Sequence, residues 1–202
     1  MRKLALALAL SAMALLGLAL AGPAAAATSG GCHLQGQASF NPGLNSSSRP
    51  FSYSFGGQLS NCQSNTAGTP ASGSVEAGKV YTDSTGEQFQ EPVSTGTGGC
   101  TNSTTAGTAI VTWADGTVTL VPYTTTGAGA AVKLDGTVAP SITLAAINPQ
   151  PGQPTSTTLN TTRYAGANAV GALTFQPPDP TACNTSAGVT AAAIDGAIAL
   201  NG

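Results

Sequence analysis

The sequence predicts an all-β protein: an antiparallel β-sandwich, immunoglobulin-like or jelly-roll-like, held by two disulfides. Apolar and polar residues alternate with a period of two along many short segments, a pattern typical of half-buried strands. Gly, Pro and Asp-Gly turn signals separate these segments, and hardly any stretch has a helical pattern. Four cysteines follow a hydrophobic leader, and an exported chain can keep disulfides. Many short strands joined by regular turns are typical of a sandwich.

The first 27 residues are predicted to be a secretory signal peptide. They begin with Met1-Arg2-Lys3, continue with an apolar run from Leu4 to Ala21, and end among small residues. The alternative is a membrane anchor, because the run approaches the ~18 residues that can span a bilayer. No basic stop-transfer cluster follows the run, so we expect cleavage. The expected product is secreted, has no membrane span and forms one domain over residues 28–202.

The charges of residues 28–202 exclude some classes of partner. Four basic and eight acidic side chains give this part of the chain a net charge of −4. The basic residues are Arg49, Lys79, Lys133 and Arg163. Binding to a nucleic-acid backbone needs several Lys or Arg contacts on one face, which four scattered residues do not supply. We expect no nucleic-acid partner, and an extracellular glycan, protein or small molecule all remain open as ligands.

The four cysteines allow three disulfide pairings. We prefer Cys32–Cys62 with Cys100–Cys183, because each loop then stays within one half of the chain. A zinc site is the weaker interpretation, since no pair has the close C-x-x-C spacing and the chain has a single histidine. We therefore expect no metal and no cofactor.

The first two predicted strands, within residues 32–40 and 51–59, alternate clearly. In the first, Leu34 and Ala38 fall on the side opposite Gln35. In the second, Phe51 and Tyr53 share one side with Phe55 and Leu59. Phe51, Tyr53 and the lone Trp113 could form a platform that stacks on a ligand, but we favour packing in the core.

Residues 80–89 predict a hairpin whose turn runs from Asp83 to Gly86, a preferred arrangement for type I. The sequence around it contains an acidic patch made of Glu76, Asp83, Glu87 and Glu91. A solvated surface is the favoured interpretation. The alternatives are a carboxylate pair for glycoside hydrolysis and a Ca²⁺ site, for which no known loop motif is present.

Residues 109–123, AIVTWADGTVTLVPY, predict a second hairpin. A two-residue turn at Asp115-Gly116 would place Trp113 opposite Val118 and Val111 opposite Leu120 on one apolar face. The same register would place Thr112 and Thr119 together on the other face. Trp113 is therefore predicted to lie in the core.

The rest of the chain continues the β pattern. Residues 130–147 predict two strands interrupted at Pro140, and residues 148–158 a Pro-rich surface loop. Residues 167–175 predict a buried strand, after which Asp179 is expected to cap a short helical turn that begins at Pro180. Residues 191–200 predict a last strand with a further candidate Asp-Gly turn.

Common catalytic constellations are absent from the sequence. The only histidine, His33, lies on the outward side of the first strand, and no G-x-S-x-G motif occurs. A serine hydrolase needs a base beside its nucleophile. We assign no catalytic residue and expect a protein that is not an enzyme.

The leader and the segments CHLQGQASF, SFGGQLSNC, AIVTWADGTVTL and GALTFQPPDPTAC resemble small exported β proteins of high-GC Gram-positive bacteria. This resemblance implies a secreted bacterial protein and names no activity. The composition is also similar to that of the apoproteins that carry enediyne antibiotics, which are secreted, small-residue-rich sandwiches with two disulfides. The leading hypothesis is an extracellular binding or cell-envelope module. The alternatives are a carboxylate-dependent hydrolase of an extracellular polymer, and a carrier whose apolar cavity includes Trp113 or Phe51.

Overall fold

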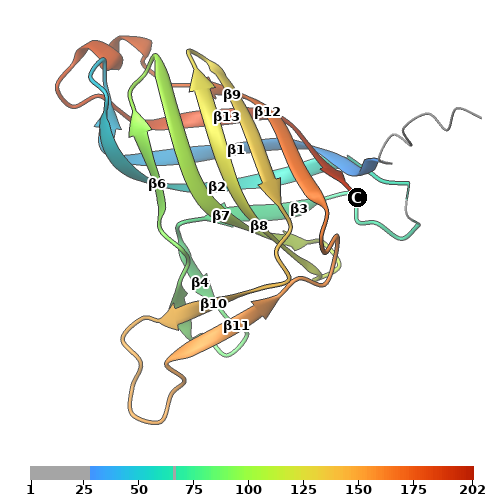
Figure 1. Ribbon diagram of the computed structural model, residues 1–202. Helices are drawn as coiled ribbons and strands as arrows, with labels where there is room; N and C mark the ends of the chain where they lie inside the picture. Colours follow the sequence, from blue (N-terminus) through green and yellow to red (C-terminus); the bar gives the residue numbers. More distant parts are fainter. Residues whose placement is uncertain (1–27, 66) are drawn as a thin grey trace, which may run out of the picture.

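The computed structural model describes residues 28–65 and 67–202, which form two antiparallel sheets and one short 3-10 helix (Figure 1). The predicted signal peptide, residues 1–27, lies outside the described residues. The all-β prediction is confirmed, because every strand pairing is antiparallel and the 3-10 turn η1, Pro180–Asn184, is the one helical element among the described residues. No helix in residues 28–65 and 67–202 is long and apolar enough to cross a membrane.

The larger sheet closes into an eight-stranded barrel. Its strands are β1 (Thr28–Leu44), β2 (Arg49–Gln63), β3 (Gly73–Ala77), β6 (Ser94–Gly98), β7 (Asn102–Trp113), β8 (Val118–Ala128), β9 (Ala131–Thr137), β12 (Asn168–Gln176) and β13 (Val189–Asn201). β3 and β6 share one position in the wall, since both lie between β2 and β7 and each pairs with a different half of β2. β1 pairs with β13 on one side and with β2 on the other, which closes the sheet.

The barrel corrects the predicted sandwich. Alternation along a strand shows which side chains face the interior, but a sandwich and a barrel share that pattern. The two architectures differ in whether the first and last strands pair. That pairing joins residues about as far apart as the chain allows, such as Cys32 and Ile198, and no local pattern encodes it.

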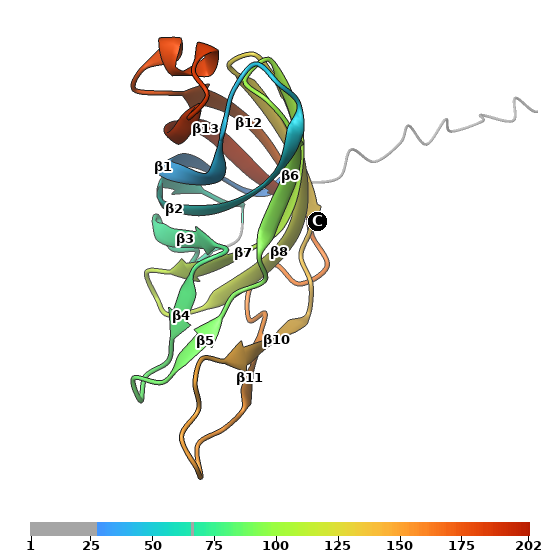
Figure 2. The same ribbon diagram turned by 90° about the vertical axis from the view of Figure 1, so that its left-hand side faces the viewer.

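A smaller four-stranded sheet packs against the outside of the barrel (Figure 2). Two hairpins that leave the barrel wall build it: β4 (Val80–Thr82) with β5 (Gln88–Gln90), and β10 (Ser141–Ala146) with β11 (Ser156–Asn160). Phe89 and Leu144 from this sheet cover Ile110 and Leu120, which point outward from β7 and β8. Burying such large apolar side chains stabilises the contact by about 1.5–3 kcal/mol for each one.

The hairpin of Trp113 forms, but its predicted register is wrong by one residue. The backbone N–H of Gly116 donates to the carbonyl of Trp113, and the N–H of Trp113 donates to Thr117, which makes a three-residue loop with Gly116 at positive φ. Val111 therefore lies opposite Thr119, and Ile110 opposite Leu120. A slip of one residue moves every side chain of the second strand to the other face.

The consequences of that slip reach both faces of the barrel wall. Val118 and Leu120 pack outward against the small sheet, whereas Thr119 is fully buried in the interior beside Trp113. The prediction that Trp113 lies in the core is confirmed, because its side chain is only 4% exposed.

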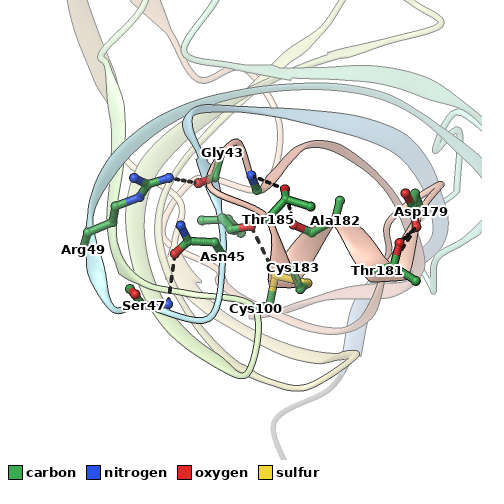
Figure 3. Close-up of a disulfide and its surroundings, with 12 residues drawn as sticks. Gly43, Asn45, Ser47, Arg49, Cys100, Asp179, Thr181, Ala182, Cys183 and Thr185 are labelled. Atoms are coloured by element: carbon green, nitrogen blue, oxygen red, sulfur yellow. Dashed lines mark hydrogen bonds between the residues drawn. A yellow bond between two sulfur atoms is a disulfide. The ribbon is translucent and has the colours of Figure 1, made fainter.

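Both preferred disulfides are confirmed, and they lie at opposite ends of the barrel. Cys32 near the start of β1 is bonded to Cys62 near the end of β2. Cys100, in the turn between β6 and β7, is bonded to Cys183 in η1 (Figure 3). The first disulfide therefore joins two neighbouring strands, whereas the second joins a turn of the barrel to η1.

Three smaller predictions can also be compared with the structure. The turn from Asp83 to Gly86 is confirmed, since the Gly86 N–H donates to the Asp83 carbonyl over 3.1 Å. The cap is confirmed too: the Asp179 carboxylate accepts from the backbone N–H of Thr181 over 2.8 Å, and Pro180 begins η1. The candidate turn at Asp195-Gly196 is wrong, because both residues continue β13 and pair with β12 and β1.

Candidate functional site: the barrel interior

A cavity of about 160 Å³ lies inside the barrel. Its walls are the inward faces of the strands, and most of its lining is apolar. The lining includes Leu34 and Ala38 of β1, Phe51, Phe55 and Leu59 of β2, Val75 of β3, Ala109, Val111 and Trp113 of β7, Val121 of β8, Leu134 of β9, Leu173 and Phe175 of β12, and Ile194 and Ile198 of β13. The predicted apolar stripe of β2 therefore faces the interior, where it forms part of the cavity wall.

Large rings fit inside this narrow barrel because glycines face them. A Cβ built on Gly36 would lie 2.5 Å from Cζ of Phe55, and one on Gly57 would lie 2.8 Å from the same atom. No real side chain approaches that closely, so the ring occupies the space that two missing side chains leave. Phe51 lies over Gly96 in the same way. Ring and glycine together determine how much of the interior stays open.

Trp113 and Tyr164 cover the end of the barrel that contains Cys32–Cys62. Their rings meet edge to face with centroids 5.6 Å apart. The indole Nε1 of Trp113 donates to the Thr119 hydroxyl over 2.9 Å, and that hydroxyl donates to the carbonyl of Arg163. The Arg163 guanidinium in turn donates to the Asp115 carboxylate over 2.6 Å. These bonds tie the segment that follows β11 to the hairpin of Trp113.

Hydroxyl groups line one wall of the cavity. The Tyr53 hydroxyl lies 2.6 Å from that of Tyr123 and 3.1 Å from that of Thr105, whose hydroxyl lies 2.7 Å from that of Thr125. Burial raises the pKa of both tyrosines above the ordinary value, so both hydroxyls stay neutral at physiological pH. We call these four side chains the hydroxyl row.

The other end of the barrel is crossed by residues 177–188, the connection between β12 and β13, which we call the strap. Its helix η1 has no buried residue of its own. Cys183 ties the strap to Cys100, and the turn between β1 and β2 lies alongside this bond (Figure 3). There Cys100 N–H donates to the carbonyl of Asn45, and Ser46 N–H donates to the carbonyl of Cys183, each over 2.9 Å. Within η1, only the partly buried Ala182 and Cys183 pack against an apolar cluster, which consists of Leu44, Phe51, Val189 and Ala192. The cross-link and the backbone bonds hold the rest of the strap.

The acidic patch predicted from the sequence is not one site. Asp83 lies in its own turn, where hydrogen bonds from the side chain and backbone of Thr85, and from the N–H of Glu87, lower its pKa. Glu87 lies in the same hairpin of the small sheet. Glu76 is half-exposed on the outer face of β3 and pairs with the Lys79 ammonium over 3.2 Å.

Glu91 differs from the other three acidic residues because it is 1% exposed. One carboxylate oxygen accepts from the backbone N–H of Lys79 over 2.9 Å, and the other has no hydrogen-bond partner among residues 28–65 and 67–202. Burial raises the pKa of Glu91, and the nearby charge of Glu76 raises it further. Glu91 lies where the chain returns from the small sheet to the barrel, just before β6. The prediction of a wholly solvated patch is therefore wrong for this residue.

His33 lies on the outer face of the barrel, half-exposed, with its Nε2 3.2 Å from the Asp195 carboxylate. The Gln35 amide donates to the same oxygen, and these two contacts lower the pKa of Asp195. No group of three or more His, Cys, Asp or Glu side chains in residues 28–65 and 67–202 is arranged to hold a metal ion.

Comparisons with known proteins give no match: no protein-family model, curated protein or solved structure is similar to this chain.

Sequence reasoning found Trp113, Phe51 and Tyr53 but missed Thr105, Tyr123, Thr125 and Tyr164. Residues 103–108 read STTAGT, and neighbouring small polar residues show no alternation from which an inward face could be identified. Tyr123 was missed because the register of its hairpin was predicted wrongly by one residue, which placed its side chain on the outer face of the sheet. Tyr164 lies in an irregular segment with positive φ, where period-two patterns carry no information.

Proposed function

We propose that this chain is a secreted, non-enzymatic binding protein that holds one small, mainly apolar molecule inside its barrel. The observation that carries the proposal is the apolar cavity of about 160 Å³ bounded by Trp113. Barrels of eight strands have an interior that side chains either fill or leave open for one small ligand. A dry apolar cavity of about 150 Å³ is large enough to bind benzene. The cavity therefore fits a molecule with roughly one ring.

Secretion is part of this proposal. The two disulfides support a non-reducing environment, because cytosolic thiols are normally kept reduced. The leader of residues 1–27 supports export on sequence grounds. A carrier of small molecules outside the cell also benefits from a cross-linked barrel, since unfolding would release its ligand.

Toluene is a suitable first probe, and the protein carries its own reporter. Trp113 is the only tryptophan in the chain and lines the cavity, so its fluorescence should change as toluene binds. We expect saturable, one-to-one binding by fluorescence and by titration calorimetry. A fluorescence change that never saturates, with no heat of binding, would overturn the proposal.

A matched pair of variants separates the interior from the surface. Ala109→Leu fills the cavity from β7, whereas Ala106→Leu adds the same side chain to the exposed face of the same strand. We expect Ala109→Leu to weaken toluene binding about tenfold or more, because the side chain occupies the ligand's volume, at a stability cost of about 1–3 kcal/mol. Ala106→Leu should bind toluene like the natural chain. Equal binding by both variants would place the ligand elsewhere.

A further inference from the structure

The hydroxyl row gives the cavity two chemically different parts. Along the inward face of β7 the residues run from Ser103 and Thr105 at the strap end to Val111 and Trp113 at the opposite end. The partner strand β8 repeats this order, with Thr125 near the strap and Val121 toward Trp113. On β7 and β8 most hydroxyl groups of the wall thus lie toward the strap, where Phe51 and Phe175 add apolar surface. Toward Trp113 the wall is apolar apart from Thr119, whose hydroxyl is already bonded to the indole and to the Arg163 carbonyl.

The hydrogen bonds within the hydroxyl row leave the hydroxyl of Thr125, its last member, free to bond to a ligand. Three bonds join the four hydroxyls in the order Tyr123, Tyr53, Thr105, Thr125. A hydroxyl can donate one hydrogen bond and accept two. The Thr125 hydroxyl makes one hydrogen bond within the described residues, to the Thr105 hydroxyl, and Thr125 lines the cavity. The Thr125 hydroxyl can therefore accept a hydrogen bond from a ligand. When Thr105 is the donor in the bond between the two threonines, the Thr125 hydroxyl can also donate one to the ligand.

The surroundings of the row favour a neutral group. No Lys, Arg or His is among the described residues that line the cavity, so nothing there would pair with an anion. The same burial that keeps Tyr53 and Tyr123 neutral would penalise a charged ligand. The buried carboxylate of Glu91 lies close enough to raise the pKa of Tyr123, and it would also oppose a negative charge.

We propose that the ligand is a neutral molecule of about one ring that carries a hydroxyl group, a phenol or small alcohol, and that Thr125 and Thr105 bind this group while Trp113 and its apolar neighbours hold the body. A hydroxyl on the ligand can both donate and accept, so it matches either orientation of the row. This inference rests on the proposed function and names the class of ligand for the same cavity.

Phenol and toluene test the inference, because they have nearly the same shape and differ in one hydroxyl. The measured quantity is the ratio of their dissociation constants in the natural chain and in the double variant Thr105→Val/Thr125→Val, in which each threonine keeps its shape and loses its hydroxyl. We expect the variant to lose about fivefold in its relative preference for phenol, the effect of one net hydrogen bond. Its affinity for toluene should be unchanged or higher.

Two control variants make that result specific. Thr105→Ser/Thr125→Ser keeps the hydroxyls and should keep the preference for phenol. Thr143→Val/Thr158→Val removes a similar hydroxyl pair, 3.2 Å apart and exposed on the small sheet, and should change nothing. Retained toluene binding shows that the valine pair is folded. If that pair fails to fold, Thr125→Val alone should reduce the preference for phenol over toluene in the same direction.

The two proposals fail in different ways. An unchanged phenol-to-toluene ratio in the valine variants, with both ligands still bound, would overturn the assignment of a hydroxyl ligand and leave the cavity proposal standing. Tighter binding of benzoate than of phenol would overturn the preference for a neutral group. If neither toluene nor phenol binds to the natural chain, the cavity proposal itself is wrong.

Discussion

At one end of the barrel, side chains that belong to the core cover the interior; at the other end, a connecting segment crosses it. Trp113 is part of β7, and it contacts Tyr164 and Thr119 as well as the main apolar cluster. The strap has no buried residue in η1 and depends on Cys183, on backbone bonds and on the Asp179 cap. The first end therefore contributes to folding stability, and the second can open at a lower cost in free energy.

This difference predicts where a ligand passes. Opening the Trp113 end would expose a large aromatic ring and break the buried bond from its indole N–H to Thr119. Opening the strap end would separate two small, partly buried side chains of η1, Ala182 and Cys183, from the apolar cluster around Leu44, and η1 has no fully buried residue. We therefore expect ligands to move through the strap end, with the disulfide Cys100–Cys183 limiting how far the strap moves.

Removing each disulfide separately should distinguish the two ends most clearly. Cys100→Ser/Cys183→Ser opens a loop with a sequence separation of 83, and Cys32→Ser/Cys62→Ser one of 30. The chain-entropy model gives losses of about 4.5 and 3.5 kcal/mol, respectively. Only the first variant should also bind toluene faster, by about tenfold, because the strap acts as a lid. Denaturant unfolding and stopped-flow fluorescence of Trp113 measure the two effects.

The rate measurement decides between the ends. Equal association rates in both disulfide variants would mean that the strap is not the route of the ligand. Faster binding in the Cys32–Cys62 variant alone would reverse the comparison.

Trp113→Ala should be the most costly single change at the opposite end. It removes a buried ring and leaves the Thr119 hydroxyl without its indole donor, so we expect a loss of about 3–5 kcal/mol in the free energy of unfolding. The neighbouring Thr112→Ala, on the exposed outer face, should stay within about 0.5 kcal/mol. Urea unfolding followed by circular dichroism measures both. A loss below about 1 kcal/mol for Trp113→Ala would show that this end is as loosely held as the strap.

Acid should loosen the strap more than the Trp113 end, with the smallest effect of the three. The pKa of Asp179 is lowered mainly by the hydrogen bond from the Thr181 side chain, and that of Asp115 mainly by the one from Thr117. A carboxyl with a lowered pKa stabilises the folded state above its unfolded pKa, and this contribution is lost as the pH falls through the folded value. For both groups the loss occurs below about pH 4.

Amide hydrogen exchange, corrected for the intrinsic effect of pH, measures that loss at each end. Exchange should increase in residues 180–185 on acidification and change less in residues 113–117, because Trp113 stays packed without the charge of Asp115. Asp179→Asn keeps an oxygen that can cap η1 but does not titrate, so it should remove the acid response of the strap. An unchanged response in this variant would mean that another group controls the strap.

The sequence predicted the interior more reliably than the architecture. Leu34, Phe51 and Leu59 were assigned to the core from period-two alternation, and all three face the barrel interior. That inference succeeds because successive side chains of a strand must point to opposite sides, whatever the sheet does elsewhere. The same alternation cannot distinguish a sandwich from a barrel.

The hydroxyl row shows why the site was predicted only in part. Tyr53 was recognised from its own strand, but its partners Tyr123 and Thr105 come from β8 and β7. Which residues of β8 face inward depends on whether the turn at Gly116 has two residues or three. Both loops accept an Asp-Gly pair, so the choice depends on how the flanking strands pack. Glu91 likewise reads as a surface residue, yet it is buried beside Lys79, where the chain returns from the small sheet to the barrel.

The β class of the chain, the capped turn at Asp179 and the inward faces of β1 and β2 follow from the amino-acid sequence, because each depends on near neighbours or on the chemistry of a few residues. For the disulfides the sequence supported a preference among three pairings. The closure of β1 on β13, the one-residue register of the Trp113 hairpin and hence the cavity with its row of hydroxyls are seen only in the folded barrel. Those features require contacts between distant strands, whose free energies depend on packing throughout the barrel.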